Sequence, residues 1–389
     1  MKRFVVRCAS GITLAFLLVS SGLGQQGSGS PKYLVVDTHN DTAQRVLIEK
    51  ADLGQRTKDG TIDLPRLREG GVMVPFLALW VPTYYKGSTA VQRTLDLRDA
   101  MQGVLDKYPD QIELATSLSD IKRITGQKKI AAIFTAEGGH QIDNDLGVLR
   151  MYRRMGILAM TLTHFRNNDW ADSSTDKEVH HGLTDFGKQV VREMNAIGMI
   201  VDISHVSDKT FYDALQVSTK PVIASHSSCR SISNIPRNMT DDMLRALAKN
   251  GGVVGINFSA SFLNQADGDD LMKVVNEQNA KEPPQTQPEL DQFAAKDTAD
   301  SGEWNPTIGH ATIDDAVQCI DHAVKIAGID HVGIGSDFDG IPMVPKGLED
   351  VSKLPNLAAA LSKRGYSEQD ISKIMSGNFL RVIGEVVGK

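Results

Sequence analysis

Cysteine is scarce in this chain of 389 residues, which contains only Cys8, Cys229 and Cys319. So few cysteines cannot form the disulfide scaffold that holds small secreted domains together. A single bridge is possible, but nothing in the sequence supports it. Cys229 follows His226 by three residues and could be imagined as a nucleophile, although a thiol of the core or of a loop is the more common role.

Basic residues are in the minority, with 42 Lys and Arg against 48 Asp and Glu, for a net charge of −6. Nucleic acid binding needs a basic stripe, and we find none, so nucleic acid is not an expected partner. The hydrophobic fraction of 41% and the charged fraction of 23% are ordinary for a globular protein with material for a large core.

Long apolar runs are absent except near the start of the chain. There, three basic residues precede an apolar stretch at 9–19, which is followed by small residues. This is the layout of a secretory signal, and ~11 apolar residues are too few for a bilayer, which needs ~20. We expect a signal peptide at 1–24, cleaved near Gly24, and a short linker at 25–32. The alternative is an uncleaved membrane anchor.

Signal cleavage implies an exported protein, either periplasmic or secreted. It leaves 39 basic and 48 acidic residues, a net charge of −9. The final residues "GEVVGK" lack the apolar stretch of a lipid-anchor signal, so we expect no stable membrane anchor after cleavage.

Eight apolar runs bounded by turn residues are spread along the rest of the chain. They are nearly continuous, as expected for parallel strands that are buried on both faces. The runs occupy residues 33–39, 72–80, 129–137, 156–164, 198–205, 221–226, 251–259 and 331–339.

Segments with helical spacing lie between these runs. Three of them have a Thr at the start and a Gly at the end, which are typical helix caps. The pairs are Thr184 with Gly198, Thr240 with Gly251, and Thr312 with Gly328. Strands that alternate with helices through eight rounds predict an α/β fold, a closed (β/α)8 TIM barrel, as a single domain at 33–389. The segment at 367–387 is expected to be a closing helix.

One polar stretch, residues 264–311, interrupts this alternation and contains "EPPQTQPELDQ". A long insertion on a connection from strand to helix lies on the active-site face of a barrel. We therefore interpret it as a lid or rim, and a surface excursion without function is equally consistent with the sequence.

Polar side chains end six of the eight predicted strands, and in a barrel all these ends meet at one mouth. Any one of these histidines alone is more often a hydrogen-bonded core residue than a ligand. A lone buried carboxylate would carry a large desolvation cost unless it met cations. Together they predict a metal site. The residues are His39, Asp41, Glu137, His164, His205, His226 and Asp337.

The number of ligands suggests two ions. Five protein ligands are too many for one tetrahedral catalytic zinc that must keep a position open. If Glu137 bridges, His39 and Asp41 hold one ion while His205 and His226 hold the other. Two ions ~3.5 to 4 Å apart can share a water and lower its pKa toward ~7, which supplies hydroxide. These ligands suit Zn²⁺ best, with Mn²⁺ or Co²⁺ as possible substitutes.

Other motifs fit less well. "GIGSDFDG" follows the wrong elements for a dinucleotide site and has no Lys for a phosphate loop. "SDFDG" matches only the first half of a calcium loop, because "IPMVPKG" does not continue it.

These residues stand in segments that resemble the renal, or membrane, dipeptidase family (peptidase family M19) of the amidohydrolase-type barrels. The resemblance covers nearly the whole chain after the predicted signal and is highly specific. It is carried by "DTHNDT", "TAEGGHQIDND", "TLTHFRNNDWADSS", "GLTDFGKQVVREMNAIGMIVDISHVSD", "ASHSSCRSISNIPRNMTDDML" and "HVGIGSDFDG".

The resemblance implies roles for individual residues. It implies that His39, Asp41, Glu137, His205 and His226 bind two Zn²⁺ ions. It further places His164, Arg237 and Asp337 at the substrate, and Arg237 is not among the strand-end residues. With these positions, Arg237 can clamp a substrate carboxylate, His164 can donate to a developing oxyanion, and Asp337 can shuttle a proton.

The sequence departs from the family on the substrate side. A tyrosine that some relatives carry after the Asn-Phe pair is Ser259 here, and the segment 264–311 is long and polar. The lipid-anchor tail of animal members is absent.

The predicted function is that of an exported binuclear zinc dipeptidase, which by resemblance accepts C-terminal D-residues and β-lactams. The alternatives are another binuclear amidohydrolase, acting on N-acyl-amino acids or lactones, or a catalytically silent binding protein. A homodimer is expected only by analogy with the family.

Overall fold

The computed structural model describes residues 31–280 and 306–388. The predicted signal peptide at 1–24, the linker as far as residue 30, and residues 281–305 of the predicted insertion lie outside this part of the chain. Among the helices in the described ranges, none is both long and apolar enough to span a membrane.

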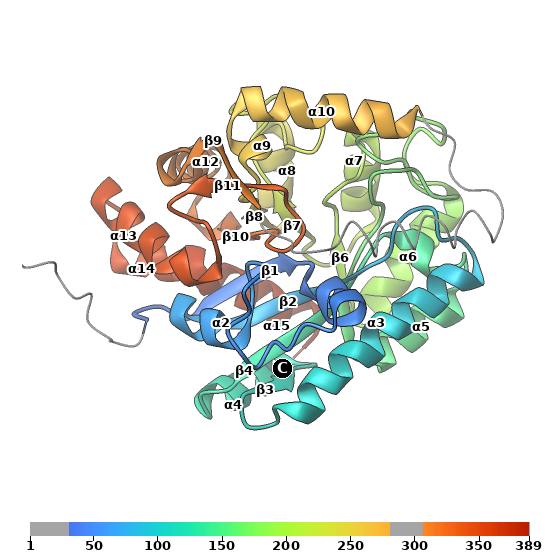
Figure 1. The fold of residues 1–389 in the computed structure, drawn as a ribbon. Coiled ribbons are helices and arrows are strands. Elements are labelled where there is room, and N and C mark those ends of the chain that lie inside the picture. The colour runs from blue at the N-terminus through green and yellow to red at the C-terminus, as the bar shows by residue number, and fades with distance from the viewer. Residues whose placement is uncertain (1–30, 281–305, 389) are drawn as a thin grey trace, which may run out of the picture. The chain divides into compact units, whose positions relative to one another are not determined.

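Eight parallel strands form a closed barrel, as predicted (Figure 1). Seven neighbouring pairs follow from the order β2-β1-β10-β8-β7-β6-β5-β4, and the pairing of β2 with β4 closes the ring. The strands are β1 (Val35–Asn40), β2 (Val72–Trp80), β4 (Ile130–Glu137), β5 (Ile157–Thr161), β6 (Ile200–Asp202), β7 (Ile223–Ser227), β8 (Val253–Ile256) and β10 (Val332–Ile334).

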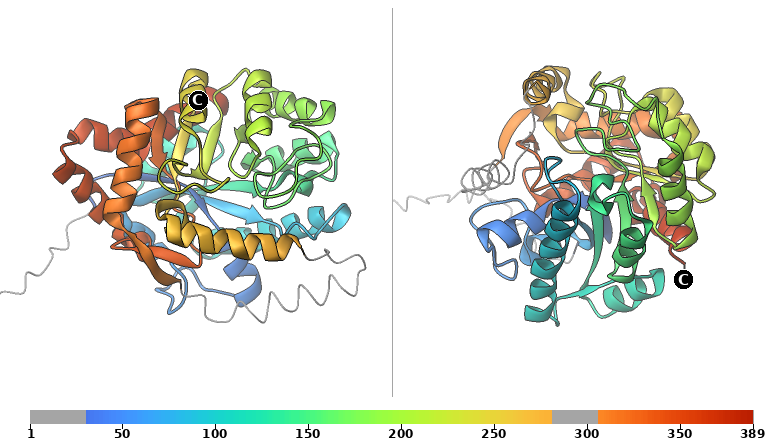
Figure 2. Two further views of the ribbon diagram at one scale, coloured as in Figure 1. Left: turned by 90° about the horizontal axis from the view of Figure 1, so that it is seen from above. Right: turned by 90° about the vertical axis from the view of Figure 1, so that its right-hand side faces the viewer.

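Helices pack around this barrel, as Figure 2 shows from two further directions. They are α1 (Thr42–Gln44), α2 (Leu64–Gly70), α3 (Ser88–Lys107), α4 (Leu118–Gly126), α5 (Leu146–Arg154), α6 (Asp185–Ala196), α7 (Asp208–Val217), α8 (Asp241–Asn250), α9 (Ala260–Leu263), α10 (Gln265–Asn279), α12 (Ile313–Ala327), α13 (Leu354–Arg364), α14 (Glu368–Ser372) and α15 (Asn378–Val386). Short 3-10 turns lie at Gly139–Ile142, Ile329–His331 and Val351–Lys353, and π-helical turns at Arg45–Glu49 and Lys373–Gly377.

The predicted helix caps are present. The Thr184 and Thr240 side chains accept the backbone N–H of the third helical residue, and Thr312 forms a reciprocal capping box with Asp315. Gly251 ends α8 with a φ of 84°, a conformation that glycine adopts without a Cβ penalty. Local sequence therefore determines where these helices begin and end.

The core has two parts. One lies between the strands and the surrounding helices, and the other fills the amino-terminal end of the barrel. In the second part, Val36, Val74 and Ile133 of the strands pack with Phe379 and Val382 of α15. The predicted terminal helix thus closes this end, although it is interrupted by the π-helical turn between α14 and α15.

Three strands were not predicted: β3 (Ile112–Leu114) beside β4, and the pair β9 (Thr307–Thr312) with β11 (Met343–Lys346). β3 and β11 have only three and four residues, and β9 (TIGHAT) is half exposed and mixes polar with apolar residues. None of them therefore shows the apolar run by which buried strands are recognised. The described ends of the 264–311 segment contain the whole of α10 and all but the last residue of β9. α10 contacts α9 and β9.

The two cysteines of the barrel are buried free thiols. Their Sγ atoms lie 3.1 Å apart, and neither residue lines the cavity described below. Cys229 is thus a core residue and not a nucleophile at that cavity.

Candidate metal centre

The seven side chains predicted at the strand ends come together at the carboxyl-terminal mouth of the barrel. His39, Glu137 and His226 lie within β1, β4 and β7 themselves and are at most 2% exposed. The other four follow their strands and are at most 9% exposed; they are Asp41, His164, His205 and Asp337.

Two of these side chains depend on unusual backbone conformations. The sequence predicted that strands extend through His205 and Asp337, but β6 ends at Asp202 and β10 at Ile334. His205 and Asp337 instead lie in tight turns with φ of 68° and 65°. Left-handed backbone is rare in residues with a side chain and is concentrated at functional sites.

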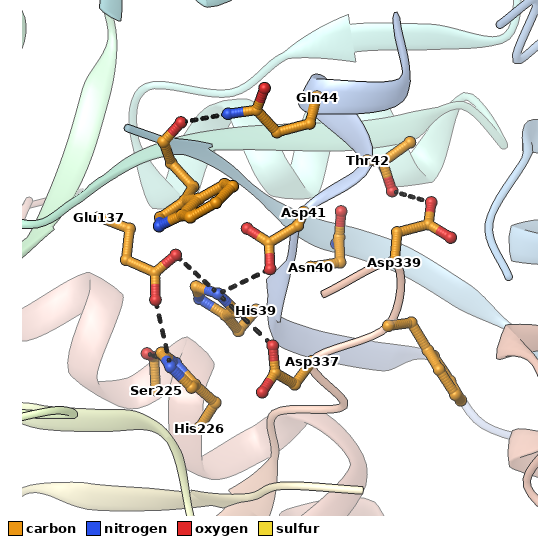
Figure 3. Close-up of polar contacts among 12 residues, drawn as sticks. His39, Asn40, Asp41, Thr42, Gln44, Glu137, Ser225, His226, Asp337 and Asp339 are labelled. Carbon is orange, nitrogen blue, oxygen red and sulfur yellow. Dashed lines mark hydrogen bonds and ion pairs between the residues drawn. The ribbon is translucent and has the colours of Figure 1, made fainter. Parts of the chain in front are cut away.

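Glu137 links the two groups of histidine ligands. Its Oε2 lies 3.4 Å from His39 Nε2, whereas its Oε1 lies 3.1 Å from His205 Nε2 and 3.3 Å from His226 Nε2. Figure 3 shows His39 facing Glu137, Asp41 and Asp337. Three overlapping triads of these side chains have ligand atoms within 4.8 Å of one another: His39, Glu137 and His226; Glu137, His164 and His205; and His39, Asp41 and Asp337.

Burial and close charges shift the pKa values of these groups strongly. Burial alone would raise the pKa of Glu137, but the nearby imidazoles, above all that of His39, lower it well below its usual value. Burial lowers the pKa of His205 and His226 well below 6.5, so both imidazoles are neutral and can act as ligands.

Several atoms of the cluster fit a bound cation. His39 Nε2 and Asp41 Oδ1 are buried and have no hydrogen-bond partner among the described residues, which is costly for polar atoms. The Nε2 atoms of His205 and His226 face each other at 2.9 Å. A divalent ion would satisfy such a set of nitrogen and oxygen donors.

A buried network of hydrogen bonds orients the His226 ring so that Nε2 can bind a metal ion. Ser225 Oγ donates its single proton to Asp202 Oδ2 at 2.5 Å, so it accepts from His226 Nδ1 at 2.7 Å. The lone pair of His226 is then on Nε2, which faces Glu137. Asp202 also accepts from Thr161 Oγ1, which joins β5, β6 and β7 beneath the cluster.

A cavity of about 410 Å³ opens over the cluster. Its lining includes the predicted substrate residues His164, Arg237 and Asp337, and also Leu271 of α10 from the predicted insertion. Arg237 is buried, donates to the His226 carbonyl at 3.2 Å, and lies 5.2 Å from the centre of the Phe262 ring. Burial lowers its pKa to about 10, so the guanidinium is charged at neutral pH.

Two residues that support the site were not predicted from the sequence. Asn257, just after β8, donates from Nδ2 to Asp337 Oδ2 at 2.7 Å. Trp80, the last residue of β2, donates from Nε1 to His164 Nδ1 at 3.3 Å. Both lie at a strand end. A search of the strand ends for hydrogen-bond donors, as well as for metal ligands, would therefore have included them.

Known proteins that are similar to this chain include dipeptidases and metallopeptidases, as the geometry of the site suggests. A family model described as membrane dipeptidase, peptidase family M19, matches residues 30–388. The chain belongs to this family. The dipeptidase tcpJ of Claviceps purpurea is 36% identical over 366 residues, which cover 90% of this chain and 76% of that protein.

Solved structures of a probable dipeptidase and of a metallopeptidase share the fold. The probable dipeptidase PvdM of Pseudomonas aeruginosa is 26% identical, with a TM-score of 0.76 and coverage of 92% of this chain and 96% of that one. A metallopeptidase of Rhodobacter sphaeroides is 24% identical, with a TM-score of 0.75 and coverage of 91% and 99%. This M19 member is therefore a dipeptidase of a metallopeptidase family, with a cluster of His, Glu and Asp able to bind metal.

Proposed function

We propose that this M19 dipeptidase hydrolyses small dipeptides with two divalent metal ions, Zn²⁺ in the native enzyme. The observation that carries the proposal is the position of Glu137, whose two oxygens face His39 on one side and His205 with His226 on the other. Asp41 completes the first group, with Oδ2 3.8 Å from His39 Nε2. Such ions, when bound, polarise a carbonyl and lower the pKa of water.

Arg237 and His164 bind the substrate in this proposal. The buried Arg237 guanidinium has no carboxylate within ion-pair distance among the described residues, so it is available to a substrate carboxylate. His164 faces the same cavity, and burial lowers its pKa to about 4. A neutral imidazole can donate one N–H to the oxygen of the scissile carbonyl, where negative charge develops.

Asp337 is the residue that carries a proton to the leaving amine in this proposal. Its Oδ2 is engaged by Asn257, which leaves Oδ1, 3.9 Å from His39 Nε2, on the side of the metal cluster. Burial raises the pKa of Asp337 to about 7, a value suited to receiving and returning a proton at neutral pH. The carboxyl group can therefore deliver a proton to the amine nitrogen as the peptide bond breaks.

Stereochemistry and export belong to the same proposal. The Rhodobacter sphaeroides metallopeptidase is liganded with a phosphinate mimic of the dipeptide L-Ala-D-Ala, and this supports acceptance of a C-terminal D-residue here. The proposal also includes activity on β-lactams, which follows from the family resemblance. The basic and apolar pattern of the first 24 residues supports export.

A dipeptide panel tests the proposed function. Protein containing two equivalents of Zn²⁺ should release free amino acids from L,L- and L,D-dipeptides. Chelation should abolish the activity, and added Zn²⁺ should restore it. Absence of cleavage by metal-replete protein would overturn the proposal. Faster turnover of N-acetyl amino acids or lactones than of any dipeptide would assign the barrel to another amidohydrolase activity.

Replacing Arg237 with Met should raise KM for dipeptides about 10- to 100-fold, with a smaller effect on kcat, because charge-assisted hydrogen bonds to the substrate carboxylate are lost. Steady-state kinetics measures both constants. Dipeptide amides, which lack the carboxylate, should be poor substrates of the wild type and should be affected much less by the substitution. Arg245→Met, on the exposed face of α8, is the matched control. An equal loss on dipeptides and dipeptide amides would contradict the clamp.

A further inference from the structure

The indole of Trp80 contacts the imidazole of His164 through a hydrogen bond that has a defined direction. Trp80 Nε1 lies 3.3 Å from His164 Nδ1. An indole N–H can only donate, so His164 Nδ1 must be the acceptor. Because an accepting ring nitrogen carries no proton, His164 is neutral and holds its proton on Nε2.

The other side of the imidazole points toward the reaction site. His164 Nε2 lies 3.7 Å from Glu137 Oε1, and His164 is part of the cavity lining. The rings of Phe165 and His205 lie 4.6 and 4.4 Å from the His164 ring centre. A half-turn of the ring would replace both nitrogens by carbons at these two polar contacts, so the orientation is fixed from both sides.

The backbone around Trp80 is itself held in place. Trp80 pairs with Glu137 in the register of β2 and β4, so the indole and the central carboxylate come from adjacent positions of the barrel. Gln44 Nε2 donates to the Trp80 carbonyl at 2.5 Å, and Arg93 donates to Gln44 Oε1 at 2.9 Å. The donor is therefore placed by strand pairing on one side and by a side-chain network on the other.

We propose that Trp80 is a positioning residue that fixes His164 in the tautomer with Nε2 protonated, so that this N–H is aimed at the carbonyl oxygen of the scissile bond. The assignment rests on the proposed function for its catalytic consequence. The tautomer itself follows from the contact between the two side chains.

Trp80→Phe tests this inference, because it keeps an aromatic ring and removes only the donor side of the indole. We expect kcat for dipeptides to fall about 10-fold, as for other residues that orient a functional histidine, while KM changes less than about 2-fold. The matched control is Trp170→Phe. Trp170 is 1% exposed, and its Nε1 has no hydrogen-bond partner among the described residues, so both kinetic constants should stay near the wild-type values.

A spectroscopic readout separates positioning from packing. In the full-length zinc-loaded protein with ¹⁵N-labelled histidine, the ring nitrogens of His164 should report a protonated Nε2 and an accepting Nδ1. These signals are assigned from their absence in His164→Asn. In Trp80→Phe the Nδ1 signal should lose its hydrogen-bond shift and both signals should move toward a mixture of tautomers, whereas Trp170→Phe should leave them unchanged.

Two results would overturn the inference. One is a wild-type spectrum in which Nδ1 carries the proton. The other is an unchanged His164 spectrum in Trp80→Phe, whatever its activity. If wild-type protein cleaves no dipeptide but the His164 signals shift as expected, the proposed function fails while the tautomer assignment stands. Thermal melting of both variants shows whether a loss of kcat reflects a loss of folded protein.

Discussion

Glu137→Gln is expected to lower kcat/KM for dipeptides by about 10³-fold or more and to reduce the bound metal below two equivalents. Glutamine has nearly the same size, but it offers one acceptor oxygen in place of two and carries no charge. In the structure both oxygens of Glu137 are used, since they face imidazoles on opposite sides. Losing such a group removes electrostatic stabilisation at the centre of the site.

Metal analysis alongside kinetics checks this expectation. The matched control is Glu113→Gln at the surface, where Glu113 pairs with Arg123 and Lys129 far from the cluster in the fold. The control should keep both the activity and the metal content. Full metal content and full activity in Glu137→Gln would refute the central role of this carboxylate and with it the proposed arrangement of two ions.

Asp337→Asn should lower kcat by about 10² to 10⁴-fold with little change in KM or metal content, because general acid–base catalysis contributes rate enhancements of this size. The fold should tolerate the change. Asn257 can still donate to the side-chain oxygen of the variant, so the turn that holds residue 337 keeps its hydrogen bond. The substitution removes the negative charge and the ability to accept and release a proton, while the size of the side chain is nearly unchanged.

The same substitution at an exposed carboxylate is the matched control for the loss of proton transfer. Asp96 accepts from Gln92 on the surface of α3, and Asp96→Asn should leave kcat unchanged. Wild-type kcat in Asp337→Asn at neutral pH would assign the proton transfer to another group. A loss of bound metal together with activity would instead show that Asp337 is a metal ligand. The distance of 3.9 Å between Asp337 Oδ1 and His39 Nε2 is consistent with that alternative.

The sequence predicted the barrel well because its strands are buried on both faces. Such strands appear as unbroken apolar runs, and all eight lie where the runs indicated. Helix ends were equally readable, since Thr184, Thr240 and Thr312 cap their own helices through contacts three residues away. The strands β9 and β11 were not predicted because β9 mixes polar with apolar residues and is half exposed, and β11 has only four residues, so neither forms a long apolar run.

The candidate site was readable for a related reason. A barrel brings every strand end to one mouth, so polar residues at strand ends share a location whatever their separation in the chain. His39, Glu137 and His226 were found this way. Arg237 was indicated only by family resemblance, since it lies on a loop after β7 and no local pattern marks it.

The sequence by itself determined the fold class, the helix caps and the set of candidate ligands, because these depend on burial patterns, local hydrogen bonds and strand ends. Only the tertiary structure decided how the side chains face one another. It placed His205 and Asp337 in left-handed turns, set one oxygen of Glu137 toward each histidine group, and brought the Trp80 donor to His164. These contacts join different strands of the closed barrel, and no local pattern in the chain specifies the distance or direction between such strands.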